Sequence, residues 1–282
     1  MTAATISHPC RAASRLSSLR WLISDVAVLA GRSLARIARE PETLMDVTIQ
    51  PILFVLLFAY VFGGAILLPG GGNYHEYLIG GMLAMGLAAT APGTAVALVS
   101  DMSSGLIDRF RSLPTARSAV LAGRTVADLV TQAIGTAVVA GVGLAIGWRI
   151  HSSAADAAAA FGLALLFGYA FTWLGACLGM VLRSPEAAQQ LGFVLFFPLM
   201  FVSNAFVPTQ GMPGWLQAIA NWNPMSALAA ASRELFGNPN PAASVQAWPM
   251  QHPELAVIGW SAVLLAVFAP LAVHLYRRKA AG

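Results

Sequence analysis

Residues 157–182 read AAAAFGLALLFGYAFTWLGACLGMVL, a run of twenty-six residues without one charged side chain. A bilayer span needs about 20 predominantly apolar residues in succession. Only a helix or a closed barrel can satisfy its backbone hydrogen bonds in lipid, and a barrel strand would be a short segment of alternating polarity. The stretch therefore predicts a transmembrane helix.

Similar apolar runs recur along the chain. The whole sequence is 57% hydrophobic and only 10% charged, whereas soluble domains carry about 25% charged residues. We therefore predict an all-α, polytopic membrane protein in which residues 41–282 form one transmembrane domain in lipid. The six predicted spans are about 47–68, 77–100, 120–147, 157–182, 190–207 and 255–276.

The distribution of basic residues predicts the orientation of these spans. In a six-span arrangement, fourteen of the sixteen Lys and Arg residues fall on one side, and only Arg149 and Arg233 fall on the other. Basic residues accumulate in cytoplasmic loops. We expect a multi-pass protein of the bacterial cytoplasmic (inner) membrane with both termini in the cytoplasm.

The N-terminal region divides into two parts. Residues 1–20 are polar and predict a flexible cytoplasmic segment. Residues 21–40 have an apolar face, with Arg32, Arg36 and Arg39 together on another face. This pattern is typical of an amphipathic helix lying in the membrane interface, although a soluble helix packed against the protein would show it too.

A cytoplasmic loop at 101–119 has a pattern of its own. Leu106, Phe110 and Leu113 recur at intervals of four and three, which places them on one face of a short helix that Pro114 would end. A charged amphipathic helix between two spans suits docking to a soluble partner. An ordinary positively charged cytoplasmic loop explains the same residues equally well. The charged residues off the apolar face are Asp108, Arg109 and Arg111.

Motifs for catalysis are missing from the sequence. The only lysine, Lys279, is not in a phosphate-binding loop, and the five histidines are scattered. Cys10 and Cys177 predict neither a disulfide nor a metal site. No basic stripe with interleaved aromatic residues suggests nucleic acid. We expect no enzyme activity and no bound cofactor. Asp128 is explained by a local pair with Arg124 at i,i+4.

Two other features concern packing and anchoring. The pairs Gly143…Gly147 and Gly175…Gly179 have the spacing that lets helices approach closely, and we interpret them as packing contacts. The long segment 208–253 contains an apolar pattern that either anchors it at the membrane interface or takes part in gating. Its members are Trp215, Leu216, Ile219 and Trp222.

Three stretches resemble one family of transporters. They are Gly105–Arg124 (GLIDRFRSLPTARSAVLAGR), Gln50–Gly64 (QPILFVLLFAYVFGG), and Phe206–Val207–Pro208 followed by Met212–Leu216 and Asn221–Pro224. Together they are similar to type-2 ABC exporter permeases of the daunorubicin-resistance (DrrB-like) branch, from about residue 20 to the C-terminus.

The resemblance implies roles for matching positions. Residues 21–40 would be an interfacial connecting helix next to an ATPase, and residues 103–113 a cytoplasmic coupling helix. The segment 208–236 would form extracytoplasmic re-entrant helices at the outer mouth. The coupling residues would be Leu106, Asp108, Arg109, Phe110, Arg111, Leu113 and Pro114. The outer-mouth residues would be Pro208, Pro213, Trp215, Trp222 and Pro224.

The family likeness implies a permease subunit of an ATP-driven exporter. Two copies of a separate ATPase would bind ATP and magnesium, and a second permease copy would complete a dimer, which we expect to be a homodimer. Spans almost free of charge favour a small hydrophobic or amphipathic cargo such as a drug, an antibiotic or a lipid. The alternatives are an ATP-independent secondary transporter, disfavoured by the scarcity of buried charge, an exporter of glycolipid or polysaccharide, and an intramembrane enzyme, disfavoured by the missing catalytic clusters.

Overall fold

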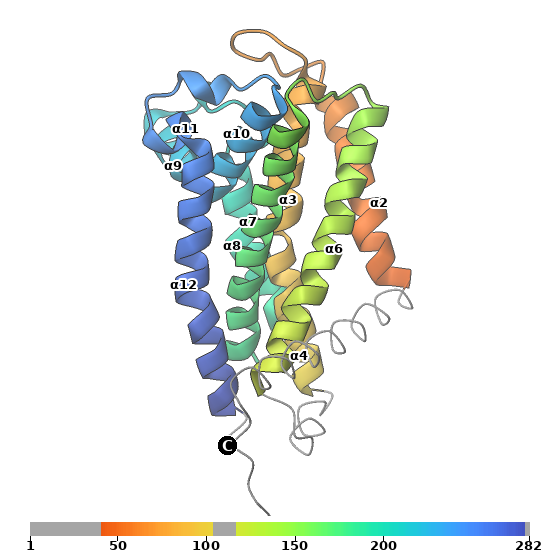
Figure 1. Ribbon diagram of the computed structural model, residues 1–282, viewed down its shortest axis with the longest axis vertical. Helices are drawn as coiled ribbons and strands as arrows, with labels where there is room; N and C mark the ends of the chain where they lie inside the picture. Colours follow the sequence, from red (N-terminus) through yellow and green to blue (C-terminus); the bar gives the residue numbers. More distant parts are fainter. Residues whose placement is uncertain (1–40, 104–116, 280–282) are drawn as a thin grey trace, which may run out of the picture.

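The computed structural model describes residues 41–103 and 117–279, and within these ranges every regular element is a helix. The predicted interfacial helix at 21–40 and the predicted coupling helix at 103–113, apart from Ser103, lie outside the described residues. The described helices stand side by side as an elongated bundle with a group of short helices at one end (Figure 1). We call that end the cap end. The loop end is the opposite one, where one helix ends at Ser103 and another begins at Arg117.

Six helical rods build the bundle, close to the six predicted runs. Four of them are long and apolar enough to cross a membrane by length and composition, whereas the first and fifth are shorter. The count of six spans therefore stays a prediction for those two. The rods are α2 (Pro41–Leu57) with η1 (Phe58–Phe62), α3 (Tyr74–Ala88) with α4 (Thr90–Ser103), α6 (Arg117–Ala145), α7 (Ala154–Val181), α8 (Pro185–Phe201) and α12 (Pro253–Lys279).

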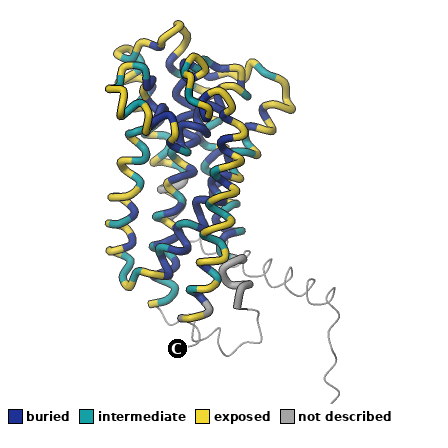
Figure 2. The backbone as a smooth tube through the Cα atoms, turned by 90° about the vertical axis from the view of Figure 1, so that its left-hand side faces the viewer, coloured by how far each residue is buried: buried dark blue, intermediate teal, exposed yellow. Residues whose placement is uncertain are grey.

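The cap is built from the segment between α8 and α12. Its short helices cover one end of the bundle, and buried residues gather beneath them and along the inner helices (Figure 2). The predicted segment 208–236 is therefore folded and helical over most of its length. The cap helices are η2 (Thr209–Gly211), α9 (Gly214–Trp222), α10 (Pro224–Phe236), η3 (Pro241–Ser244) and α11 (Trp248–Gln251).

Local sequence signals fix several helix boundaries. Ser184 accepts a hydrogen bond from the Ala187 amide and Pro185 occupies the first helical position, so α8 begins there. Gly237 ends α10 in the left-handed conformation, at φ +70°. Pro92 lacks an amide hydrogen and leaves the Ala88 carbonyl without its helical donor, which explains why the α3–α4 rod breaks at Ala89.

Glycines on α7 allow the closest helix contacts in the bundle. A side chain at Gly175 would overlap the Ala91 carbonyl, and one at Gly179 would lie 2.9 Å from the Ala95 carbonyl oxygen. The packing interpretation of this pair is confirmed. For the other predicted pair it is wrong at Gly147, which has φ +102° in the turn after α6 and nothing near its Cβ position.

This packing generates a stability prediction. We expect Gly175→Ala to destabilise the protein by about 1–3 kcal/mol, because the added methyl overpacks the α4–α7 contact. Gly162→Ala on the same helix is the matched control, since its Cβ would meet nothing within 4 Å. Thermal unfolding of both purified variants checks this. Equal melting temperatures would contradict it.

Candidate functional site

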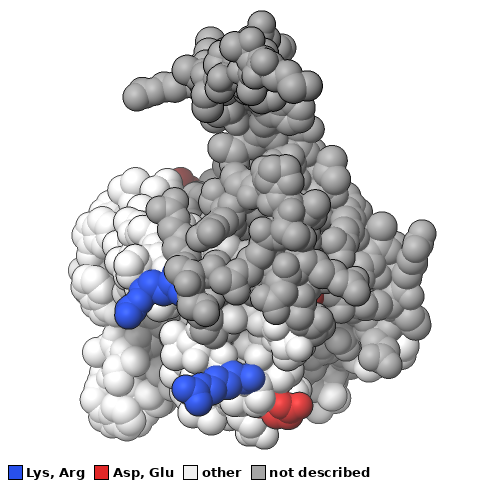
Figure 3. All heavy atoms as spheres, turned by 90° about the horizontal axis from the view of Figure 1, so that it is seen from below, with Lys and Arg blue, Asp and Glu red and all other residues white. Residues whose placement is uncertain are grey.

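Most of the residues predicted to matter are not among those that the structure describes. The predicted coupling residues, Leu106, Asp108, Arg109, Phe110, Arg111, Leu113 and Pro114, lie outside the described residues, as do Arg32, Arg36 and Arg39. The structure describes the two helices that flank the loop, α4 and α6. The described part of the loop-end surface is mostly uncharged, with a few charged side chains (Figure 3).

The predicted outer-mouth residues all lie in the cap. Pro208 precedes η2 and is buried, whereas Pro213 immediately precedes α9 and Pro224 is the first residue of α10. Trp215 and Trp222 both lie on α9, and both are more than half exposed. The cap therefore brings these five residues into one structural unit.

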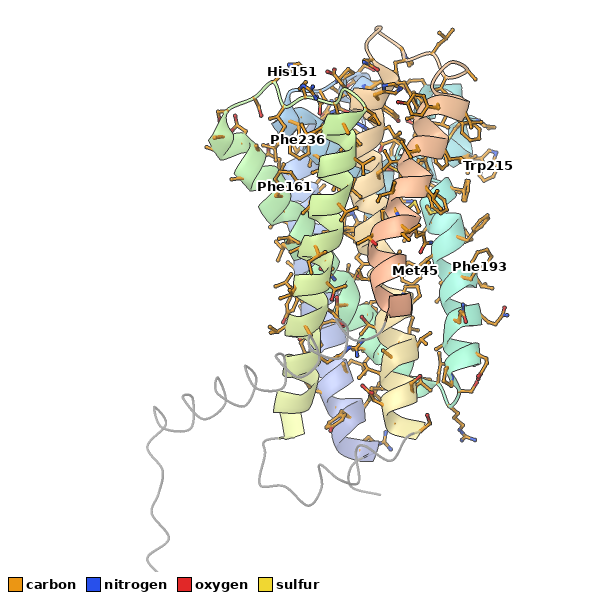
Figure 4. The ribbon with its side chains drawn as sticks, turned by 90° about the vertical axis from the view of Figure 1, so that its right-hand side faces the viewer. Met45, His151, Phe161, Phe193, Trp215 and Phe236 are labelled. Carbon is orange, nitrogen blue, oxygen red and sulfur yellow. The ribbon has the colours of Figure 1, made fainter. Side chains whose placement is uncertain are left out.

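Helix α9 is amphipathic, as its sequence predicts. Trp215, Ile219 and Trp222 are exposed, while Ala220 and Asn221 are buried against the cap. The Trp215 side chain points away from the bundle (Figure 4). Large apolar side chains on an outward face, with Trp among them, are typical of a helix anchored at a membrane interface. The exposed positions of these side chains fit the anchoring alternative.

The most constrained side chain in the cap is Arg233 of α10, which is fully buried. Its Nε donates to the Tyr77 carbonyl at 2.8 Å, and one terminal nitrogen donates to the carbonyls of Asn204 and Ala205 at 3.0 and 2.9 Å. The other nitrogen lies 3.3 Å from Asn204 Oδ1. The guanidinium also stacks 3.5 Å from the Tyr77 ring centroid. A buried cation is tolerated when hydrogen bonds replace its hydration.

The segment that follows α8 depends on these donors. It runs through the interior as non-helical backbone, where an unpaired carbonyl would be costly. Tyr77 donates its hydroxyl to Asn204 O and Tyr74 donates to Phe206 O, while Arg233 serves Asn204 and Ala205. Three successive carbonyls are thus bonded by side chains from α3 and α10.

Small residues make room for this cluster. A side chain at Gly81 would overlap the Ala205 backbone, and one at Gly80 would lie 2.9 Å from both the Ala229 carbonyl oxygen and Arg233 Cγ. Asn223 completes the join. Its Nδ2 donates to the carbonyls of Leu199 and Val202 at the end of α8, and its Oδ1 accepts from the Met225 amide to start α10.

Counting basic residues assigns Arg233 and Arg149 to the same side, and both lie at the cap end. The count does not predict that Arg233 is fully buried there. Two signals in the sequence point to a buried position: the alanine-rich run around it and the Gly80–Gly81 pair that accommodates it. Neither signal identifies the partner by itself, because the Arg233–Tyr77 hydrogen bond joins residues 156 positions apart.

A second set of contacts joins the α6–α7 turn to the cap. Trp148 is buried and its Nε1 donates to Asn238 Oδ1 at 2.7 Å, while Asn238 Nδ2 donates to the Arg149 carbonyl. Glu76 pairs with His151 at 2.8 Å. Phe236 packs between the Trp148 and Phe161 rings, and Figure 4 shows Phe236, Phe161 and His151 near the cap end. These contacts attach the cap to the α6–α7 turn and to α7, and the Glu76–His151 pair attaches the same turn to α3.

The predicted Arg124–Asp128 pair is confirmed at the loop end. Arg124 Nε lies 3.1 Å from Asp128 Oδ1, and Asp128 is almost completely buried. Among the described residues no group of three or more His, Cys, Asp or Glu side chains could hold a metal. A cavity of about 450 Å³ beside α9 is lined by uncharged residues that include Gln210, Gln217 and Trp222.

One side of the bundle exposes a row of aromatic side chains. Phe193, Phe197 and Phe201 on α8 contact one another in succession with tilted rings, whose centroids are 4.9 and 4.5 Å apart, and they are between 43 and 63% exposed. Figure 4 shows Phe193 pointing outward on the side that also carries α2. The exposed apolar residues of α2 and η1 include Leu53 and Tyr60.

Comparisons with known proteins agree with this architecture. The family model described as ABC-2 type transporter matches residues 24–236. The chain is 34% identical over 248 residues, 88% of this chain and 84% of the relative, to the daunorubicin resistance ABC transporter permease protein DrrB1 of Streptomyces coeruleorubidus. It is 25% identical over 274 residues (96 and 94%) to the probable doxorubicin resistance permease protein DrrC of Mycobacterium tuberculosis strain H37Rv. It is also 28% identical over 225 residues (78 and 76%) to a putative transport permease, ycf38, of Pyropia yezoensis.

The Arg233 cluster generates a stability prediction. We expect Arg233→Met to destabilise the protein by at least about 2 kcal/mol, because it leaves buried carbonyls without donors. Arg149→Met is the matched control, since Arg149 is exposed and, among the described residues, its side chain bonds only the nearby Leu144 and Trp148 carbonyls. Thermal unfolding of the purified variants checks the difference. A similar loss in both variants would refute the assigned role.

Proposed function

The chain belongs to the ABC-2 type transporter family, and from this we propose that it is the membrane-spanning permease subunit of an ATP-driven exporter. The 34% identity to a daunorubicin resistance permease over most of both chains carries the proposal. The helical bundle supports it, because four of its helices are apolar and long enough to cross a membrane. The energy source is ATP hydrolysed by a separate ATPase chain.

The proposed cargo is a hydrophobic or amphipathic compound. Two observations support this choice. The relatives named above include permeases for daunorubicin and doxorubicin resistance. In addition, the exposed and half-buried side chains of α2 and α8 are mostly apolar or aromatic. A hydrophobic molecule can therefore bind this surface without the free-energy cost of removing water from a charged group. Export would run from the cytoplasm or the inner leaflet toward the cap end.

We place the ATPase at the loop end. That end would be cytoplasmic by the distribution of basic residues. The loop between α4 and α6 carries Asp108, Arg109 and Arg111, which would contact a groove on the ATPase. Closure of two ATPase copies on ATP would push this loop, and the permease would rearrange to release cargo outward.

Replacing Asp108, Arg109 and Arg111 together with Ala tests this coupling. We expect the variant to insert into the membrane normally, to lose co-purification of the ATPase, and to lose drug export more than tenfold. Arg149→Ala, in the α6–α7 turn at the opposite end, is the control, because it changes the net charge by the same −1. Unchanged export would reject the coupling assignment. ATPase stimulation by polar sugars but not by doxorubicin would reject the hydrophobic cargo.

We further propose that two copies of the chain pair through the side formed by α2 and α8. The exposed Phe193, Phe197 and Phe201 rings lie there, and the α3–α4 rod has exposed glycines at 86 and 93 with nothing within 4 Å of their Cβ positions. Packing of flat rings against small residues stabilises helix association in lipid, where burial of apolar surface alone does not. A homodimer would place the two α8 rows opposite one another.

Cysteine crosslinking tests the pairing. In a background with Cys10 and Cys177 replaced by Ser, we expect Phe197→Cys to form a disulfide-linked dimer on mild oxidation in membranes. Ile258→Cys on α12 is the control, because its side chain is also exposed but lies on a rod that packs against α7 instead. Crosslinking at both positions alike would indicate random collision and would overturn the interface.

A further inference from the structure

The two helices that flank the 104–116 loop are joined within the bundle by polar side chains. Helix α4 ends at Ser103 and α6 begins at Arg117, so they are the two arms of that loop (Figure 1). On α6, Arg124, Asp128 and Gln132 follow one another at intervals of four, which places them on one face of the helix. We call these three residues and their partners on α4 the polar seam.

The first part of the polar seam is centred on Asp128. Its Oδ2 accepts from the Thr94 hydroxyl of α4 at 2.9 Å, and its Oδ1 accepts from Arg124 Nε at 3.1 Å. Arg124 also lies 3.9 Å from Asp101 near the end of α4. Each carboxylate oxygen of Asp128 thus has a donor, one from each arm. Loss of either partner would leave a buried charge poorly compensated.

The second part is centred on Gln132, one helical turn further from the loop. Its Nε2 donates to Thr90 of α4 at 3.2 Å and to Thr172 of α7 at 2.8 Å. Both hydroxyls give their own hydrogens to backbone carbonyls, at Leu87 and Gly168 respectively. Their lone pairs therefore face Gln132, which fixes the amide nitrogen toward them.

The contacts of α4 with its other neighbours are of a different kind. Gly175 and Gly179 of α7 face the α4 backbone directly, and Gly192 of α8 faces Pro92. Such small-residue contacts bring backbones close together. Toward α6, polar side chains of α4 instead contact the longer polar side chains of the other arm: Thr90 bonds Gln132, Thr94 bonds Asp128, and Asp101 lies near Arg124. The register between the two arms at this depth therefore depends on hydrogen bonds and charge.

The polar seam ends at a break in the neighbouring rod. Thr90, which Gln132 holds, is the first residue of α4, and Ala89 separates it from α3. On the other side of the break, α3 is fixed to the cap by the Arg233–Tyr77 hydrogen bond and by the close contact at Gly81. A rod that is fastened differently on the two sides of a break can bend there.

We propose that Asp128 and Gln132 are positioning residues that make α4 and α6 move together when the loop between them is displaced, with the break at Ala89 as the pivot. This inference rests on the proposed function. Without the polar seam, a displacement of the loop would slide α4 past α6, and the movement would stay at the loop end. With the polar seam, α4 and α6 move together, and the movement reaches the middle of the bundle.

Transport stoichiometry tests the proposal in the complete complex. Asp128→Asn and Gln132→Leu complexes with the ATPase are reconstituted in liposomes, and doxorubicin transported per ATP hydrolysed is measured. We expect this ratio to fall at least fivefold, which is the lower end of typical coupling between sites, while ATPase binding and basal hydrolysis stay within twofold. Thr131→Val, whose hydroxyl bonds only the Ala127 carbonyl of its own helix in the described contacts, and Gln190→Leu, exposed on α8, are the matched controls.

A distance measurement separates positioning from general stabilisation. Nitroxide labels at Ser103→Cys on α4 and Ala133→Cys on α6 replace exposed residues. The inter-label distance should be the same with and without trapped nucleotide in the otherwise wild-type complex, and should broaden in Asp128→Asn. A nucleotide-dependent change in the wild-type distance, or an unchanged transport ratio in both variants, would overturn the inference. If export by the variants fell only in proportion to the amount of complex that could be purified, the inference would also be overturned.

Failure of the proposed function gives a different result. If the wild-type chain neither binds an ATPase nor exports drug when ATP is supplied, the exporter assignment is wrong whatever the variants do. If the wild-type complex exports and the variants match it, only the role of the polar seam is wrong.

Discussion

The hydrogen bonds of one buried guanidinium organise the cap end of this protein. Arg233 has no contact with water and no carboxylate partner among the described residues, so main-chain carbonyls and the Tyr77 ring take over its solvation. The same bonds satisfy an irregular segment after α8 that could not otherwise lie in the interior. The cation and the carbonyls therefore stabilise one another, and removal of either leaves the other uncompensated.

That constraint determines where the rest of the bundle is rigid. Because Arg233 comes from α10 and its acceptors from α3 and the end of α8, three elements distant in sequence share one cluster. The glycines at 80 and 81 let them approach closely enough to share it. Toward the loop end, glycine contacts join α7 to α4, but polar side chains join α6 to α4. Different interactions therefore hold the helices together at the cap end and toward the loop end.

Much of this arrangement follows from the sequence, but only where signals are local. Runs of apolar residues predicted where the long helices lie, with boundaries that differ by up to six residues, and the i,i+4 spacing predicted the Arg124–Asp128 pair. Long-range partners could not be predicted, because nothing in a local pattern says that Arg233 meets Tyr77 or that Thr94 meets Asp128. Counting basic residues assigns Arg233 to a side of the bundle but does not predict its burial, because burial depends on partners distant in sequence.

Two charged side chains, Asp128 and Arg233, are buried among the described residues of the bundle. An intramembrane charge is commonly the mark of an ion pathway, but Asp128 and Arg233 each have their hydrogen-bonding capacity used by structural partners. Neither is aimed at an open channel in the described structure. Both buried charges therefore join helices to one another or to the segment after α8. The exposed side chains of α2 and α8, by contrast, are mostly apolar.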